Sequence, residues 1–180
     1  MDGETLIDIF DKISLMKTSF CGIIEFKNIK RLKNTKWDTL DFIVLNSNGH
    51  WLTLIWMNSD TIMLFDTLSG EMTYCKSRMK KILLNTFSGV RRVIFQYGED
   101  RIQKNGTLIC GEHVLYFLMF QTIFFLERGY FDLNYVSRLV NFCNQNGLDT
   151  DEFVWNEIYV KLKLTKPPDL MQVLHWYENW

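Results

Sequence analysis

The chain has 180 residues and a nearly even charge balance, with 20 lysines and arginines against 21 aspartates and glutamates. This balance excludes a strong overall electrostatic field, so a nucleic acid or a membrane surface would have to bind a local patch of charge. Aromatic residues make up 15% of the chain and only 2 prolines occur, which excludes a disordered or fibrous protein. One densely packed domain spanning residues 1–180 is expected.

The first predicted elements are a helix and a basic segment. Apolar residues recur at helical spacing from Leu6 to Met16, which predicts an amphipathic helix over residues 3–17. The segment 26–36 has no clear period, and we expect an irregular surface stretch there. Its basic side chains are Lys27, Lys30, Arg31, Lys33 and Lys36.

The stretch 40–66 predicts a three-stranded meander, because three apolar runs are separated by the turn sequences NSNG and NSD. Antiparallel pairing about Ser59 places His50, at the exit of the first turn, close to Asp66, at the end of the third strand. A short helix over 76–87 and a strand over 91–97 should then cover or extend the sheet.

A helix that is apolar nearly all round is predicted from Cys110 to Arg128, which is typical of a helix buried at the centre of a domain. Its apolar run is shorter than the roughly 20 residues that a membrane span needs. A further helix over 133–146 should stop before Gly147, and Asp149 begins a capping box for the next one. Residues 168–180 are expected to form a C-terminal tail whose apolar stripe docks on the domain.

These elements predict an α+β fold in which a mixed sheet packs on a central buried helix that starts at Cys110, with further helices around it. The cysteines form no CxxC pair and the charged N-terminus resembles no secretory signal, so we expect reduced thiols in an unsecreted protein. Cys21, Cys75 and Cys143 are interpreted as structural or exposed thiols.

Four side chains are candidates for a catalytic site: a thiol, an imidazole, a carboxylate and an amide. A helix N-terminus favours the thiolate form of a cysteine, so Cys110 is the candidate nucleophile. His50 is the candidate base, and Asp66 can orient its ring. Gln103 precedes the cysteine by seven residues and can donate an N–H to a developing oxyanion.

The motifs NSNGHWLTLIW, LFDTLSG and QKNGTLICG, in this order, resemble those of adenain, the adenovirus-type maturation protease, and its relatives from virophages and other large DNA viruses. The resemblance spans about residues 20–125. It implies a papain-like clan fold with His50 as general base, Asp66 as the third triad member, Gln103 in the oxyanion hole and Cys110 as nucleophile. Trp51 is expected to pack against the imidazole and to contact substrate.

By this resemblance, the chain is expected to cleave viral capsid or core precursors during virion maturation. Its location would be the virion and the infected cell, in the nucleus or a cytoplasmic virus factory. No cofactor, metal or membrane is expected to be required. Adenain-like enzymes can use DNA, so the basic side chains of 26–36 are candidates for DNA contact. Segment 85–103 lacks a cysteine for a disulfide-linked activating peptide, which leaves the tail as an alternative activator.

Several alternatives stay open from the sequence. SUMO-specific proteases share the order of the four residues, so a ubiquitin-like-protein deconjugase is the second functional hypothesis. A non-catalytic scaffold is the third, because a lone cysteine in an apolar helix is often a core residue. His113 competes with His50 as base and could form half a metal site with Cys110, although no second ligand pair has zinc spacing. His175 belongs to the tail.

Overall fold

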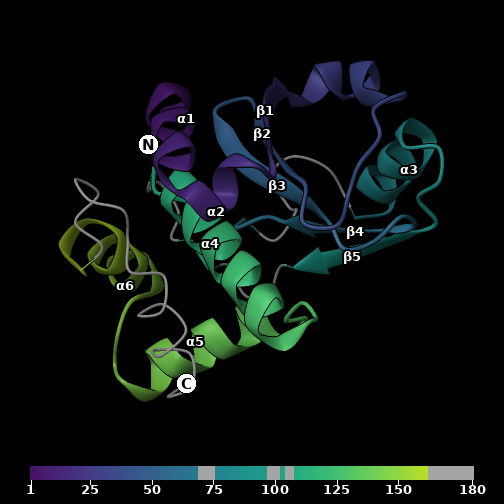
Figure 1. Cartoon of the computed structure of the whole chain (residues 1–180). Helices are drawn as coiled ribbons and strands as arrows, with labels where there is room; N and C mark the ends of the chain where they lie inside the picture. Colours follow the sequence, from purple (N-terminus) through teal and green to yellow (C-terminus); the bar gives the residue numbers. More distant parts are fainter. Residues whose placement is uncertain (69–75, 97–101, 104–107, 162–180) are drawn as a thin grey trace.

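The structure is a computed structural model that describes residues 1–68, 76–96, 102–103 and 108–161. Cys75, the loop after Gln103 and the C-terminal tail therefore lie outside the described residues, as do the sequence predictions made for them. Most strands lie in the first half of the chain, helices occur both before and after them, and the architecture is mixed α+β, as predicted (Figure 1).

A five-stranded sheet forms the middle of the fold, and its spatial order follows the order of the chain. The outer pairs, β1 with β2 and β4 with β5, are parallel, whereas the inner pairs are antiparallel, so the sheet is mixed. The predicted meander and the strand after it are confirmed. The strands are β1 (Phe20–Glu25), β2 (Phe42–Ser47), β3 (His50–Trp56), β4 (Thr61–Phe65) and β5 (Arg92–Gln96).

The turn between β2 and β3 places His50 at the first position of its strand. Asn48 and Gly49 both have positive φ, at 54° and 86°, which is the pattern of a two-residue turn that matches the twist of a hairpin. Ser47 then pairs with His50 across the hairpin. Asparagine and glycine tolerate this left-handed backbone better than other residues, so the local sequence fixes the strand register at the histidine.

Both faces of the sheet are covered, and each face has its own core. Along β4, Met63 and Phe65 point to one core, while Ile62 and Leu64 point to the other, as the two-residue period of a strand requires. Helix α3 (Lys76–Thr86) and the 3-10 helix η1 (Phe26–Leu32) cover one face (Figure 1). The other helices lie on the opposite side.

Helix α4 (Cys110–Arg128) is the central helix of that second side and packs against β3. Its residues from Cys110 to Phe124 are all buried, which confirms the predicted core helix. The ring of Phe117 stacks on Phe65 of β4 with centroids 4.2 Å apart. The surrounding helices are α1 (Gly3–Lys12), α2 (Ser14–Lys17), α5 (Tyr135–Gln145), α6 (Thr150–Asn156) and the π-helical turn η2 (Glu157–Lys161).

Helices end and begin at the glycines and the capping residue that the sequence predicted. Gly129 caps α4 in the left-handed conformation, with φ of 77°. Gly147, with φ of 64°, follows α5. The carboxylate of Asp149 accepts hydrogen bonds from the backbone N–H groups of Asp151 and Glu152 and so caps α6. In the described ranges, no helix combines the length and hydrophobicity needed to cross a bilayer.

Two predictions about the N-terminal third were wrong, and one strand was missed. The helix expected over 3–17 breaks at Ile13, whose extended backbone lets apolar residues on both sides of the break reach the core. Segment 26–36 is not irregular throughout, because 26–32 form a 3-10 helix that buries Phe26 and Ile29 at its three-residue period. Strand β1 was not predicted at all.

Candidate active site

Cys110 is the first residue of α4, as predicted, and only 5% of it is exposed. Backbone groups of Trp51 and Gly111 interact with its sulfur and lower the pKa of the thiol. At the start of the helix, backbone N–H groups that have no partner within the helix are thus available to the thiol. This surrounding favours a negative charge on sulfur.

His50 joins the thiol to a carboxylate. Its Nε2 lies 2.8 Å from Oδ1 of Asp66, and its ring also interacts with the side chain of Cys110, which raises the pKa of the imidazole. Since Asp66 occupies Nε2, Nδ1 is the nitrogen that can exchange a proton with sulfur. Asp66 is 2% exposed, and its Oδ1 also accepts the backbone N–H of Leu68 at 2.9 Å. The structure therefore brings the three predicted residues together.

The pKa values of the imidazole and the thiol move in opposite directions. Burial alone would lower the pKa of His50, but hydrogen bonds with Asp66 and Cys110 outweigh it and raise the pKa to about 9. Burial alone would raise the pKa of Cys110, but the bond with His50 and those with backbone groups hold it below its ordinary value. These opposite shifts favour the thiolate form of Cys110 and the imidazolium form of His50.

Gln103 lies beside the carboxylate end of this site. It is 3% exposed, and its Oε1 accepts a 2.7 Å hydrogen bond from the hydroxyl of Thr67, the residue after Asp66. Its backbone N–H donates to the carbonyl of Thr67 at 3.4 Å. These contacts fix the side-chain amide with its oxygen toward Thr67 and its nitrogen away from it. Its role in an oxyanion hole stays a prediction.

The indole of Trp51 contacts the N-terminal segment. Its Nε1 donates to the carbonyl of Met1 at 3.1 Å. A methyl group added at Gly111 would meet Cβ of Met1 at 2.9 Å and Cδ1 of Trp51 at 3.4 Å, so the residue after the cysteine has no room for a side chain. The predicted contact of Trp51 with substrate remains a prediction.

His113 joins α4 to α6. It is fully buried, and its Nε2 lies 2.8 Å from Oδ1 of Asp151 at the start of α6. Geometry therefore favours His50 as the base. Among the described residues, no group of three or more metal-ligating side chains occurs. Cys21, Cys110 and Cys143 are free thiols.

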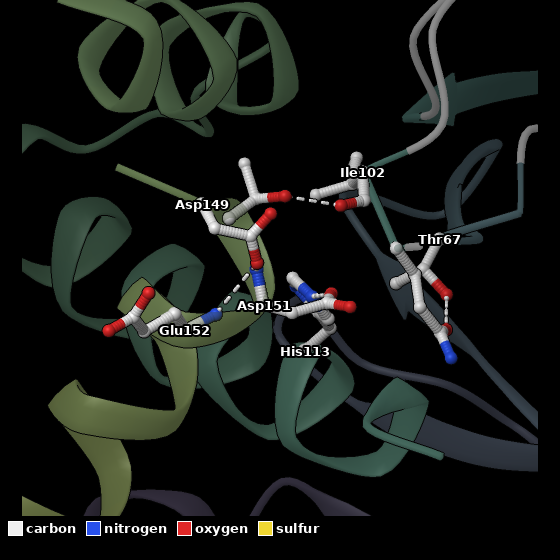
Figure 2. A network of polar contacts seen from close by, with 8 residues as sticks. Thr67, Ile102, His113, Asp149, Asp151 and Glu152 are labelled. Atoms are coloured by element: carbon white, nitrogen blue, oxygen red, sulfur yellow. Dashed lines mark hydrogen bonds and ion pairs between the residues drawn. The ribbon is translucent and has the colours of Figure 1, made fainter. Parts of the chain in front are cut away.

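The sequence interpretation missed the residues that support the site from α6 (Figure 2). The hydroxyl of Thr150 donates to the carbonyl of Ile102, directly before Gln103. Asp151 holds His113, one helical turn after the nucleophile. The sequence marked this stretch only as a helix cap. Of these supporting residues, only Thr67 could have been found from the sequence, because it directly follows Asp66, the predicted carboxylate.

The chain matches no protein-family profile and no curated protein sequence. Among solved structures, it is similar to the central domain of an uncharacterized protein from Legionella pneumophila. The two are 15% identical, the match covers 77% of this chain and 84% of that one, and the TM-score is 0.40.

The site thus contains the parts of a thiol nucleophile activated by a base that a carboxylate orients. His50 and Asp66 come from the sheet, whereas Cys110 comes from the helix that packs on it, so the site lies at the seam of these two layers. Such an arrangement can form and resolve a thioester with an acyl group. It needs no metal to generate the nucleophile.

Proposed function

We propose that the chain is a cysteine endopeptidase that cleaves viral capsid or core precursors during virion maturation. The observation that carries the proposal is that His50 contacts Asp66 and interacts with Cys110 at the head of a buried helix. The resemblance of the surrounding motifs to adenain supports the viral substrate class. The proposed location is the virion and the infected cell.

In the proposed reaction, the Cys110 thiolate attacks the scissile carbonyl carbon and forms a C–S bond. The carbonyl oxygen becomes an oxyanion, which the side-chain amide of Gln103 and backbone N–H groups stabilise. The imidazolium of His50 then gives its proton to the leaving amine as the C–N bond breaks. A water molecule, deprotonated by His50, hydrolyses the thioester and restores the thiolate.

Co-expression with structural precursors of the virus that encodes the chain tests this function. The wild-type chain should release fragments whose new termini can be sequenced, whereas Cys110→Ala should release none. Cys143→Ala is the matched control, because that thiol is buried in the core away from His50 and should be dispensable for cleavage. Intact precursors in the presence of folded wild-type chain would contradict the proposal.

The same chemistry would serve a deconjugase, and a ubiquitin-like vinyl-sulfone probe separates the two substrate classes. A capsid protease should leave this probe unreacted, whereas labelling at Cys110 would favour the deconjugase. Alkylation with iodoacetamide distinguishes either enzyme, protease or deconjugase, from a scaffold without activity. Selective alkylation of Cys110 at neutral pH is expected for an enzyme, and an unreactive Cys110 would favour the scaffold.

A further inference from the structure

A basic cavity lies between η1 and α3, on the sheet face that α4 does not cover. Its volume is about 610 Å³, which falls in the range of small-molecule sites, roughly 300–1,000 Å³. The two elements that form it are about 45 residues apart in the sequence, but both pack on the same core. The polar residues that line the cavity are Lys30, Lys33, Arg78, Lys81, Asn85 and Thr86.

Among the described residues that line this cavity, all the charged ones are basic. Segments 26–37 and 76–96 contain no aspartate or glutamate, yet they hold more than half of the 20 lysines and arginines of the chain. The rest of the chain must then be strongly acidic, because the total charge is −1. Like charges that line one cavity repel each other, and a bound anion would relieve that repulsion.

We propose that this cavity binds a compact anion that carries two or more phosphate groups. Lysine and arginine side chains are the protein groups that bind phosphate most strongly, through charge-assisted hydrogen bonds. Asn85 and Thr86 add an amide and a hydroxyl that can donate to further phosphate oxygens. A single phosphate would contact only part of this basic lining, which is why the ligand carries several.

Geometry favours a compact ligand over a nucleic acid. The lining cations converge on a hollow from two separate elements, whereas Lys27 and Arg31 of η1 and Lys80 of α3 do not line it. A nucleic acid is a long row of phosphates, and its affinity would draw on all of these charges together. The cavity is also separate from the Cys110 site, so its ligand does not depend on the proposed protease activity.

Isothermal titration of the whole chain with inorganic tripolyphosphate, at constant ionic strength, tests the proposal. Wild-type chain should bind one tripolyphosphate. Lys30→Gln with Lys81→Gln should weaken binding about tenfold or more, because two charge-assisted contacts are lost. Lys27→Gln with Lys80→Gln removes the same charge outside the cavity and should change the Kd by less than about threefold. All four lysines are exposed, so neither pair should disturb folding.

Three results would overturn the proposal. Absence of saturable binding to wild-type chain would show that the cavity is only a solvated surface. Equal weakening by both lysine pairs would show diffuse attraction rather than a site. Tight binding of a DNA duplex that depends on both pairs, with no binding of tripolyphosphate, would identify the surface as a nucleic-acid interface instead.

Discussion

At the scale of single residues, the proposed chemistry depends on how Cys110 differs from the other thiols. Cys21 is exposed, yet its pKa is raised to about 11, first by burial of part of the thiol and then by the charge of Asp41. Burial likewise raises the pKa of Cys143 to about 12. Only at Cys110, among these three, do hydrogen bonds to the sulfur outweigh burial.

The first prediction concerns thiol reactivity, which follows the thiolate fraction. The rate of iodoacetamide alkylation at Cys110 should reach half of its plateau below pH 9, whereas Cys21 should need a pH near 11. Peptide mapping by mass spectrometry after timed alkylation measures both sites in one sample. His50→Ala should shift the Cys110 profile upward. An unshifted profile would mean that the imidazole does not activate the thiol.

The second prediction concerns the His50 proton. Its pKa of about 9 lies above the ordinary 6.5, so the protonated ring stabilises the folded chain fully below pH 6.5. This stabilisation is lost as the pH rises toward about 9. Cys110→Ala removes one of the bonds that raise the pKa, and the value should fall. NMR titration of the imidazole measures both values, and equal values would refute the coupling.

At the scale of elements, the start of α6 connects parts of the site that are distant in the sequence. Thr150 bonds with the carbonyl before Gln103, and Asp151 bonds with His113 of the nucleophile helix. Figure 2 shows these contacts together with the bond between Thr67 and the neighbouring amide. A short helix therefore holds the amide segment and α4 in one arrangement.

The third prediction tests this connection through the amide. Thr150→Val keeps the shape of the side chain but removes the hydroxyl, which should loosen Gln103. An oxyanion donor contributes about 100-fold or more to kcat, so partial misplacement should lower kcat about tenfold and leave KM nearly unchanged. Thr150→Ser should restore kcat. Alkylation of Cys110 should not change, whereas a parallel loss of alkylation would indicate general damage instead.

Local patterns predicted the elements whose stability is encoded nearby. The Asn48–Gly49 turn, the apolar run after Cys110 and the glycine after Arg128 each carry their structural reason in adjacent residues. Strand β1 carries no such signal, because its parallel pairing with β2 is set by packing across the chain. The same applies to Thr150, whose partner is distant in sequence. Hence the proximity of His50, Asp66 and Cys110 was predictable from the sequence, whereas the contacts that support it from α6 were not.

At the scale of the whole molecule, the sheet separates two cores with different consequences for the site. The core on the α4 side contains Phe65, which directly precedes Asp66 and stacks on Phe117 of α4. The core on the other side contains Leu83 of α3. Only the first core fixes the distance between the sheet that carries His50 and the helix that carries Cys110.

The last prediction separates these two cores by matched truncations. Phe117→Ala and Leu83→Ala each remove a fully buried side chain, and each should lower the free energy of unfolding by roughly 2–5 kcal/mol in urea titrations. Below the unfolding transition, Phe117→Ala should also slow Cys110 alkylation severalfold, because α4 can shift against β4. Leu83→Ala should leave that rate unchanged. Equal effects on the rate would mean that the site depends on global stability rather than on the layer to which the nucleophile belongs.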